Sequence, residues 1–450
     1  MAVPVTEPAS ANLVTASTHS KPKYHLMELN ADLTKLIEDI SKDEQRQKRK
    51  RIREGDEEEG ELRSKPTLCI KGRKADEAVL CTDTQTFMIR QVTQSNSLLL
   101  CSLEEREPES STANVSVRDN IVEILELVPI VARVSRLTSL LENSAYSGED
   151  EDEEEDEITK KRYTPQQVAS IVQASPLELK KGFKEAHILE LDGHLRMISN
   201  SYLFEALRTL LAHIDRLSLS TDRILLQPAV AALRSTNEMR KEVAEEMLRS
   251  WFGNPMTNKE GDDSTDTITQ NDIKKEEEII VLDTLRISQF IGLQLLETHA
   301  KGKPMEMETF TGKWKDGLGA TLGGSENALD INLLQGNYLL TPAPPLAPSK
   351  LQPLSIEFFA ASSLPLDISS RFQRLFSIRS QWIGEDLKPF LQDVAVDAKK
   401  RDALLLKFAR SSQVKIPIQE SKQDRRARLM AGNPHAPTKN VSLYSARLRY

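Results

Sequence analysis

The strongest constraint on the fold is an aromatic-rich stretch from Arg371 to Val394, with the sequence RFQRLFSIRSQWIGEDLKPFLQDV. Its apolar residues recur at spacings of three and four, which places them on one face of a helix. A helix face that carries Phe and Trp rings has to be buried against another element. The pattern predicts one helix, a short break, and a second helix that starts near Glu385. The predicted core residues are Phe372, Leu375, Phe376, Trp382, Leu387 and Phe390.

A different period characterises the first third of the chain. Between residues 65 and 104, the runs TLCIKG, EAVLCT, TFMIRQV and SLLLCSL are short, rich in strand-forming residues and separated by polar residues. Such runs are typical of antiparallel strands. We therefore expect a β-rich, barrel-like domain over residues 23–146. Residues 1–22 and 41–64 lack a hydrophobic period and are predicted to be disordered.

Residues 160–200 predict a small module of another kind. Thr164 is a suitable N-cap with Pro165 at the first helical position, and a second helix follows Pro176. Asp192–Gly193 is a strong hairpin signal. Helix, turn, helix and hairpin in this order are typical of a winged helix.

The same pattern recurs further along the chain. We expect a second winged helix at 201–286, with a loop at 254–270, and a third at 287–412, which holds one or two units. Residues 413–450 are expected to form a basic, flexible tail. The predicted fold class is therefore α+β with several domains: a β-rich domain followed by an array of about three winged helices.

Charge is distributed unevenly. The formal net charge is −8, and nine consecutive acidic residues from Glu149 to Glu157 account for it. We interpret residues 147–159 as an acidic linker between the two kinds of domain. From Arg371 onward, 17 Lys and Arg outnumber 7 Asp and Glu. The C-terminal region therefore has the electrostatic character expected of a DNA-binding surface.

Two groups of basic residues are candidates for contact with DNA or with a polymerase. Three lysines lie on the second helix of the first module, but Glu178 and Glu185 share that helix, so a solvated or protein-docking face is the simpler interpretation. The C-terminal group is larger and shows no base-reading set, which favours sequence-independent binding. The candidates are Lys180, Lys181, Lys184, Lys399, Lys400, Arg401, Lys407, Arg410, Arg425, Arg426 and Arg428.

A further basic cluster, QKRKRIR, precedes the predicted sheet. Its composition fits a nuclear localisation signal, and an ordinary solvated loop is the alternative. The residues concerned are Lys48, Arg49, Lys50, Arg51 and Arg53.

Catalytic signatures are missing from the sequence. The seven His residues form no HExxH motif, and neither GxSxG nor a Walker A sequence occurs. The glycine-rich segment Gly317–Gly324 follows KWKD and not an apolar strand, so we interpret it as a loop and not as a dinucleotide site. His187 and His194 flank the predicted hairpin and are assigned packing or surface roles. We expect no enzymatic activity, no metal and no cofactor.

The three cysteines, Cys69, Cys81 and Cys101, lie twelve and twenty residues apart. This spacing matches neither a metal site nor a disulfide framework. Because all three lie among apolar, strand-like residues, we expect buried free thiols in a reduced, intracellular protein. No apolar run reaches 18 residues, so we expect no membrane span.

Three blocks of this sequence carry a resemblance to a known family. They are TLCIKGRKADEAVLCTDTQTFMIRQVTQSNSLLLC, from Thr67 to Cys101; the aromatic stretch continued by DALLLKFARSS; and, more weakly, YTPQQVASIVQAS, from Tyr163 to Ser175. In order and spacing over residues 24–412, the chain resembles the DCC family of sister-chromatid-cohesion proteins.

The resemblance implies a non-enzymatic subunit of an alternative clamp loader related to replication factor C. Its β-rich domain would join a large and a small partner subunit. Its winged helices would reach the catalytic subunit of DNA polymerase epsilon and bind DNA, and the complex would load or unload the PCNA clamp in the nucleus. The alternative is a stand-alone winged-helix DNA-binding regulator, which would need base-reading side chains.

Overall fold

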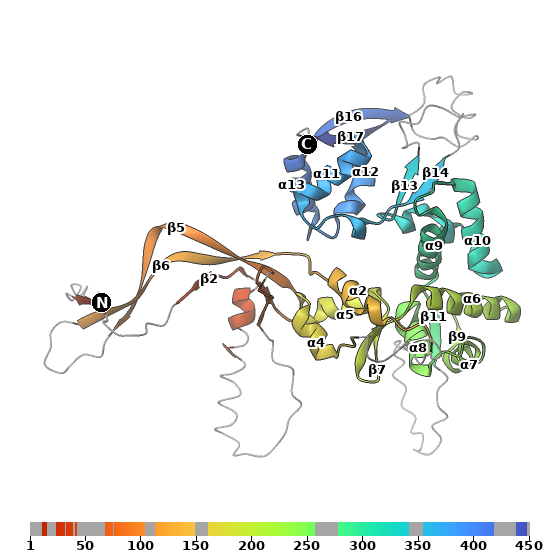
Figure 1. Cartoon of the computed structure of the whole chain (residues 1–450), viewed down its shortest axis with the longest axis horizontal. Helices are drawn as coiled ribbons and strands as arrows, with labels where there is room; N and C mark the ends of the chain where they lie inside the picture. The colour runs from red at the N-terminus through yellow and green to blue at the C-terminus, as the bar shows by residue number, and fades with distance from the viewer. Residues whose placement is uncertain are drawn as a thin grey trace, which may run out of the picture. The chain divides into compact units, whose positions relative to one another are not determined.

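The computed structural model describes residues 11–15, 24–42 except 32, 39 and 40, 68–103 except 75, 113–148, 161–256, 278–341, 354–417 and 438–447. The chain divides into two compact units, drawn in Figure 1. The first comprises residues 1–132 together with 173–178, and the second comprises residues 133–172 and 179–450. We call them the sheet unit and the helical unit. The predicted mixture of helices and sheets is confirmed, including a sheet near the N-terminus.

The sheet unit is built around one six-stranded sheet with the order β1-β6-β5-β4-β3, and β2 also pairs with β6. Figure 1 shows β5 and β6 as a long two-stranded ribbon. Both β1 and β2 pair with β6 in parallel, and the other pairs are antiparallel. The strands are β1 (Ala11–Thr15), β2 (Leu26–Glu28), β3 (Cys69–Lys71), β4 (Val79–Cys81), β5 (Thr86–Leu103) and β6 (Ala113–Pro129).

This sheet has a small core. Leu33, Leu80 and Phe87 form its buried cluster, with Ile89 and Leu127 packed against them. Along the rest of the ribbon, large apolar side chains reach solvent. Among the described residues up to 132, the exposed ones are Tyr24, Leu26, Leu29, Leu68, Ile70, Leu98, Leu99 and Val122.

The turn formed by residues 173–178 belongs to the sheet unit through specific polar contacts. Lys71 Nζ donates to the carbonyl oxygen of Ala174 at 2.7 Å, and Thr86 Oγ1 donates to Glu178 Oε2 at 2.6 Å. Glu178 also accepts from the backbone N–H of Ser175 at 2.9 Å. The buried Thr86 hydroxyl is thereby hydrogen-bonded to the half-buried Glu178 carboxylate, as burial of a polar group requires.

The helical unit repeats one arrangement along the chain. Each of its three-stranded sheets, β10-β11-β9, β12-β14-β13 and β15-β17-β16, has the last strand of its segment in the middle. In each segment the order is helix, short strand, helical turns, and a final antiparallel pair. We call these segments repeat two (200–282), repeat three (284–358) and repeat four (368–446).

Repeat two consists of α6 (Asn200–Leu217), β9 (Ile224–Leu225), α7 (Leu226–Asn237), α8 (Lys241–Glu246), η2 (Met247–Trp251), β10 (Gly253–Pro255) and β11 (Ile279–Leu282). Repeat three consists of α9 (Thr284–Ala300), β12 (Met305–Glu306), α10 (Met307–Gly323), η3 (Glu326–Leu329), η4 (Ile331–Leu334), β13 (Tyr338–Thr341) and β14 (Ser355–Phe358). After η5 (Ala361–Ser363), repeat four consists of α11 (Ile368–Ile378), β15 (Gln381–Ile383), α12 (Gly384–Leu387), η6 (Lys388–Leu391), α13 (Ala398–Phe408), β16 (Ala409–Pro417) and β17 (Thr438–Ala446).

The segment before repeat two has a related plan. A parallel bridge joins Tyr146 to Ile198, and α2 packs on α5, where a Cβ on Gly182 would lie 3.0 Å from Leu137. Its elements are α2 (Ser135–Leu141), η1 (Glu142–Ser144), α4 (Pro165–Ile171), α5 (Pro176–Glu185), β7 (Ile188–Leu191) and β8 (His194–Met197).

Local sequence signals explain several element ends. Thr164 caps α4 in a capping box with Gln167, and Pro165 is its first residue, as predicted. Asp192 and Gly193 both have positive φ, at 52° and 77°, in the turn between β7 and β8, so the predicted hairpin is confirmed. Asp283, Asp367 and Asp397 are the N-caps of α9, α11 and α13, and each side chain accepts a hydrogen bond from a backbone N–H in the first turn of its helix.

The apolar interior of the helical unit is extensive. One buried cluster runs through the first two thirds of the unit, from Tyr146 to Ile356, and includes Trp251, Phe290 and Trp314. A second cluster lies in repeat four. Packing against these buried side chains stabilises the short sheets, which would be only marginally stable by themselves.

The structure differs from the expected domain plan at several points. Contact between α2 and α5 assigns residues 133–146 to the helical unit, whereas the sequence analysis placed them in the β-rich domain. Residues 11–15 form β1, where disorder was expected. Residues 438–446 form β17, where a flexible tail was expected. The acidic run 149–157, the insertion 43–64 and most of the loop 254–270 lie outside the described residues.

Candidate functional site

The aromatic stretch forms the core of repeat four. Phe372, Leu375 and Phe376 on α11 and Trp382 on β15 are buried together with Leu387 and Phe390. The first predicted helix ends earlier than expected, at Ile378, and Trp382 lies on a strand. The reason is long-range: β15 pairs with β17, which comes more than fifty residues later. Sequence periodicity alone carries no information about that pairing.

A buried arginine that the sequence analysis missed organises this core. Arg371 is 0% exposed and uses all its N–H groups. It donates to the carbonyl oxygens of Pro365, Ala361 and Phe390 at 2.9 to 3.1 Å, and to both carboxylate oxygens of Asp393. A buried guanidinium is tolerated only with such complete pairing. Arg371 thus fixes η5, α11 and η6 to one another.

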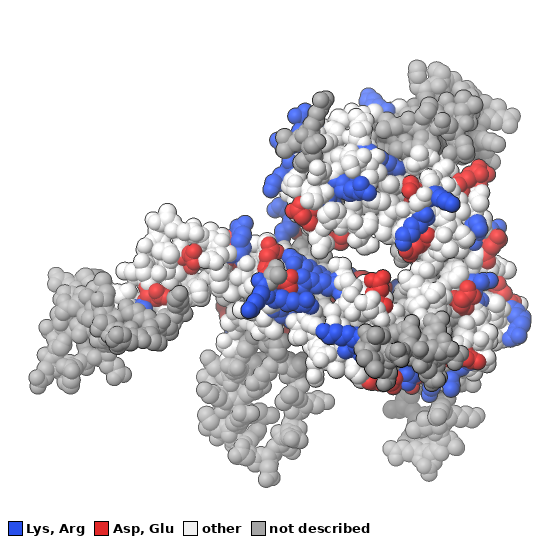
Figure 2. Space-filling model, viewed as in Figure 1, with Lys and Arg blue, Asp and Glu red and all other residues white. Residues whose placement is uncertain are grey.

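Basic side chains gather on α13, next to this core. Among the described candidates, Lys399, Lys407 and Arg410 are exposed, and Figure 2 shows Lys and Arg along the edge where Figure 1 draws α13. Lys400 and Arg401 are half-buried, and Arg401 lies 3.8 Å from Asp402. The structure therefore brings five predicted residues onto one helix and the start of β16.

The hairpin β16–β17 extends this basic surface. Exposed Lys415 and Lys439 lie on its strands. Lys439 Nζ pairs with Glu385 Oε1 at 3.2 Å, and both side chains are well exposed. Arg425, Arg426 and Arg428 belong to the connection between the strands and lie outside the described residues, as do the localisation candidates Lys48, Arg49, Lys50, Arg51 and Arg53.

The lysines of α5 form a separate group, away from the C-terminal set in sequence. Lys180 and Lys181 are exposed and Lys184 is half-buried. Lys181 Nζ lies 3.7 Å from Glu185 Oε1, an exposed pair of the kind that contributes little to stability. The acidic neighbour reduces the net positive charge of this face, as the sequence suggested.

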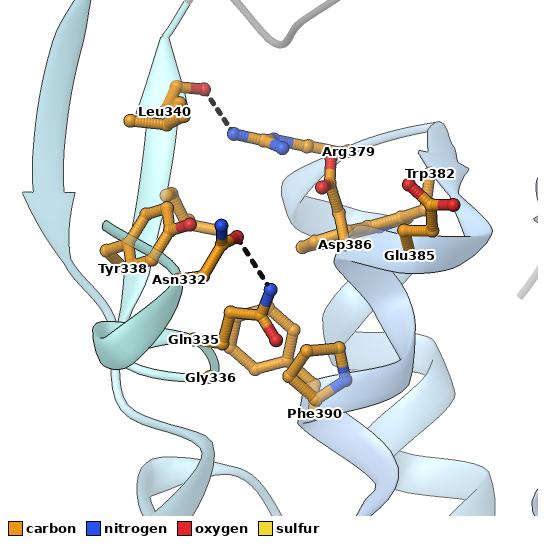
Figure 3. A pocket seen from close by; sticks show the side chains of 12 residues that line it. Asn332, Gln335, Gly336, Tyr338, Leu340, Arg379, Trp382, Glu385, Asp386 and Phe390 are labelled. Atoms are coloured by element: carbon orange, nitrogen blue, oxygen red, sulfur yellow. Dashed lines mark hydrogen bonds between the residues drawn. The ribbon is translucent and has the colours of Figure 1, made fainter. Parts of the chain in front are cut away.

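A pocket of about 130 Å³ lies between repeats three and four, shown in Figure 3. One wall is β13 with Tyr338, and the other is formed by Arg379, Trp382 and Asp386. Arg379 donates to the carbonyl oxygen of Leu340 and lies over the Trp382 ring at 5.1 Å. The hydrogen bond to Leu340 joins the two repeats, and the contact with Trp382 lies within repeat four.

The electrostatics of this pocket come from partial burial. Burial raises the pKa of Asp386, although part of its carboxyl group stays exposed, and the nearby Arg379 guanidinium opposes that rise. Burial also raises the pKa of Tyr338 to about 12, with a further contribution from Asp386. Burial lowers the pKa of Arg379. The hydrogen bond from Arg379 to Leu340 beside this pocket supports a role in packing repeat four against repeat three.

His187 occupies an aromatic cage inside the helical unit. Its ring centroid lies 5.4, 5.3 and 5.2 Å from those of Trp251, Phe252 and Phe290. Burial lowers the pKa of His187 to about 4, and the positive charge of Arg286 adds to this effect. The expected packing role is therefore supported by its surroundings.

The cysteines differ from expectation. Cys81 is buried, but Cys69 and Cys101 are exposed, so the prediction that all three are buried is wrong. The reason is that β3 and the far part of β5 carry apolar residues without a layer that covers them. Among the residues that the structure describes, no group of His, Cys, Asp and Glu could hold a metal ion. In the same part of the chain, no helix is long and apolar enough to cross a membrane.

Comparison with known proteins gives one consistent family. The family model for sister chromatid cohesion protein Dcc1 matches residues 24–391, which is most of the chain. The match ends before α13.

Individual relatives extend this result. Sister chromatid cohesion protein DCC1 of Xenopus laevis is 26% identical over 77% of this chain and 82% of its own length. The probable DCC1 of Dictyostelium discoideum is 26% identical over 78% of this chain and 87% of its own. DCC1 of Saccharomyces cerevisiae is 23% identical over 90% of this chain and 97% of its own. The chain belongs to the Dcc1 family of sister chromatid cohesion proteins.

Proposed function

We propose that this chain acts in sister chromatid cohesion as a non-catalytic, nuclear subunit of an alternative clamp loader. In this role it joins a large and a small partner subunit, docks the catalytic subunit of DNA polymerase epsilon, and binds DNA while the complex loads or unloads PCNA. Family membership supports the cohesion role. The proposals for partner subunits, polymerase docking and DNA binding rest on the family resemblance and on the exposed apolar and basic surfaces.

The sheet unit is the proposed partner-binding module. Its ribbon exposes Leu98, Leu99 and Val122, and its edge strand β3 exposes Ile70. Exposed apolar strands and open sheet edges are suited to pairing with another chain, which would supply both hydrogen bonds and a covering layer. The partner subunits are the occupants that we propose for these surfaces.

The helical unit is the proposed array of winged helices. In each repeat the final antiparallel pair has the position of a wing, and the helical segment before it has the position of a recognition helix. On this proposal, repeats two, three and four are each a winged helix. The segment from α2 to β8 is one more winged helix, and it comes before the other three along the chain. The first, with its mixed charge on α5, is the proposed polymerase-docking module.

Repeat four is the proposed DNA-binding module. The observation that carries this assignment is the cluster of exposed Lys399, Lys407 and Arg410 on α13 and the adjoining wing. Lys399, Lys400 and Arg401 occupy the first turn of α13, where the helix dipole disfavours positive charge. Their placement thus costs helix stability, and a polyanionic ligand would offset that cost. No base-reading arrangement is present among these side chains, so we propose sequence-independent contact with phosphates.

Salt-dependent DNA binding by the full chain tests this assignment. Each phosphate contact contributes roughly one unit to the slope of log affinity against log salt concentration. The variants Lys399→Ala, Lys407→Ala and Arg410→Ala are each expected to lower the slope by about one, equally for all DNA sequences. Lys303→Ala, which removes an exposed lysine from the turn between α9 and β12, is the matched control. Equal slopes in all variants would refute the assignment.

The second candidate function is a stand-alone winged-helix regulator of particular DNA sites. The basic α13 is the one feature that favours it. A defined preferred sequence, in the same binding experiment, would support the regulator, and affinity independent of sequence would support the clamp-loader subunit.

A further inference from the structure

We propose that Cys69 and Cys81 form a dithiol that hydroperoxides oxidise to an intramolecular disulfide. Cys69 is on β3 and Cys81 is on β4, and the antiparallel register places them directly opposite each other. Their separation in sequence gave no sign of this pairing. The proposal concerns a modification site in the sheet unit and does not depend on the proposed partners.

The strand geometry suits a disulfide. Opposite residues of an antiparallel pair point to the same face, with Cα atoms about 4.5 or 5.5 Å apart, depending on the hydrogen-bonding pattern. Both separations fall within the range of about 4.4 to 6.8 Å found for disulfides. The Cβ atoms of such a pair are about 4.5 to 5.5 Å apart, so closure needs an approach of about 1 Å or less.

The sheet can accommodate that approach. β3 has only three residues and stands at the end of the strand order, next to β4 alone. An edge strand has hydrogen bonds on one side and moves more easily than a central strand. The buried Cys81 stays fixed beside Thr86 Oγ1, 3.7 Å from its sulfur. Movement of β3 is therefore sufficient to close the bond.

The two thiols have different environments and so different roles. Cys69 is exposed, which gives a peroxide molecule access to its sulfur. Cys81 is 1% exposed, and burial raises its pKa, an effect that its hydrogen bond with Thr86 and the charge of Lys71 partly oppose. Because the thiolate is the nucleophile, Cys81 reacts slowly with peroxide by itself. Cys69 is the attacking residue and Cys81 the resolving one.

The chemistry is balanced with a hydroperoxide as the oxidant. The Cys69 thiolate attacks one peroxide oxygen, the O–O bond breaks, and hydroxide leaves, so that Cys69 becomes a sulfenic acid. The Cys81 sulfur then attacks the Cys69 sulfur, the S–O bond breaks, and water leaves. Two thiols together give up two electrons, and one hydrogen peroxide becomes two molecules of water.

Cys101 provides a control within the same chain. It is also exposed, but its opposite residue on β6 is Val117. Peroxide can therefore oxidise Cys101 without a neighbouring thiol to form a disulfide. The three cysteines fall in three different tryptic peptides, because Lys71, Arg90 and other basic residues separate them. Mass spectrometry can thus assign every product.

The test is oxidation of the purified full chain with hydrogen peroxide, followed by thiol blocking and non-reducing peptide mass spectrometry. The expected product links the Cys69 and Cys81 peptides, persists in Cys101→Ser, and disappears on reduction. Dimedone, which captures sulfenic acids, should label Cys69 several-fold more in Cys81→Ser than in the parent chain. Hydrogen exchange of β3 and β4 amides should slow on oxidation.

Several results would overturn the proposal. One is conversion of Cys69 to sulfinic acid with Cys81 still a free thiol. Another is a disulfide that involves Cys101 or that joins two chains. Unchanged dimedone labelling of Cys69 in Cys81→Ser would also contradict it, because Cys81 would then not resolve the sulfenic acid. Native amide exchange of β5 and β6, which belong to the same sheet, confirms that each variant is folded around the substituted position.

Discussion

The two units of this chain bury apolar surface to very different extents. In the helical unit, Trp251, Trp314 and Trp382 are all essentially inaccessible to solvent, and one cluster extends through two repeats. In the sheet unit, three residues form the buried cluster, while Leu98, Leu99 and Ile70 are exposed on long strands or at an edge. Composition contributes to the contrast, because all three Trp and every Phe except Phe87 belong to the helical unit.

The contrast is consistent with the separate functions that we propose for the two units. A packed interior stabilises an element through its own contacts and leaves the surface free for charged residues, as on α13. A two-stranded ribbon with uncovered apolar residues is suited to a covering layer from another chain, which is the role that we propose for the partner subunits. The stability of the helical unit should tolerate surface substitutions and be sensitive to core substitutions. Partner binding by the sheet unit should instead be sensitive to substitutions on its exposed surface.

The largest stability effect is expected at Arg371. Arg371→Ala removes five donated hydrogen bonds and leaves Asp393 and three carbonyl groups without their partner. Loss of one member of a buried ion pair costs about 3–5 kcal/mol, and because the Asp393 side chain is 40% exposed we expect a value toward the low end of that range. Hydrogen exchange of α11 and η6 amides in the full chain should rise accordingly. Arg374→Ala, an exposed neighbour on α11, is the control and should change stability by less than about 0.5 kcal/mol.

The next effect depends on pH and involves His187. Burial lowers its pKa to about 4 in the folded state, whereas the ordinary pKa of a histidine is 6.5. Between these values the unfolded chain binds the proton and the folded chain does not. The contribution of the neutral His187 to the free energy of unfolding is therefore fully present above pH 6.5. It is lost as the pH decreases toward 4, by roughly 3 kcal/mol in total.

Denaturation of the helical unit, followed by Trp fluorescence at several pH values, measures this slope. His187→Asn keeps a residue that tolerates the positive φ of 51° and removes the ionisation. It should reduce stability at neutral pH and flatten the slope between pH 4 and 6.5. An unchanged slope would assign the acid sensitivity to other groups.

A smaller effect is expected at a close approach between two helices. Gly292 on α9 faces the Trp314 indole of α10, and a Cβ there would lie 2.7 Å from a ring atom. Trp314 is held in place because its Nε1 donates to the carbonyl oxygen of Ser288 at 2.9 Å. Gly292→Ala should therefore destabilise the unit by about 1–3 kcal/mol.

Gly312 is the matched control for this substitution. It lies in α10, and a Cβ there meets no atom within 4 Å. Gly312→Ala should stabilise the helix by about 0.5–1 kcal/mol. Thermal unfolding measures the change in stability for both variants, which should be a loss at Gly292 and a gain at Gly312. Destabilisation by Gly312→Ala would show that helix packing does not account for the loss at Gly292.

The smallest stability effect is expected on the exposed ribbon. Leu98→Ser and Leu99→Ser replace side chains that are 42% and 53% exposed. Each should change the stability of the isolated chain by no more than about 0.5 kcal/mol. A large loss of stability would mean that the ribbon is already covered within the chain, which would remove the contrast between the units.

Local signals in the sequence predicted much of this structure. The Thr164 cap, the Asp192–Gly193 hairpin and the short strands β3 and β4 depend on neighbouring residues and were predicted. The runs TFMIRQV and SLLLCSL were predicted as separate short strands, but both belong to the single 18-residue strand β5. β15 and β17 were missed because their pairing joins distant segments, and Gln381–Ile383 continues an apolar pattern that resembles a helix. Arg371 was missed because nothing in its neighbourhood indicates that a charged residue is buried.

The candidate surfaces could be predicted only where they depend on residues close together in the sequence. Basic residues on one helix, such as Lys399 and Lys407, can be grouped from their spacing alone. The exposure of Cys69 and its position opposite Cys81 could not be deduced, because both depend on strand register and on which face is covered. Register is a property of two segments together.

We propose that the sheet unit binds partner subunits and that repeat four binds DNA. One affinity purification from nuclear extract, with quantitative mass spectrometry and bound-DNA measurement, tests it on three tagged full-length chains: the parent, Leu98→Asp/Leu99→Asp and Lys399→Glu/Lys407→Glu. We predict that the parent recovers clamp-loader subunits and polymerase epsilon, that the first variant loses the subunits, and that the second keeps the subunits and loses DNA. Recovery of the parent alone, or loss of the subunits from the second variant with retention by the first, would contradict the account.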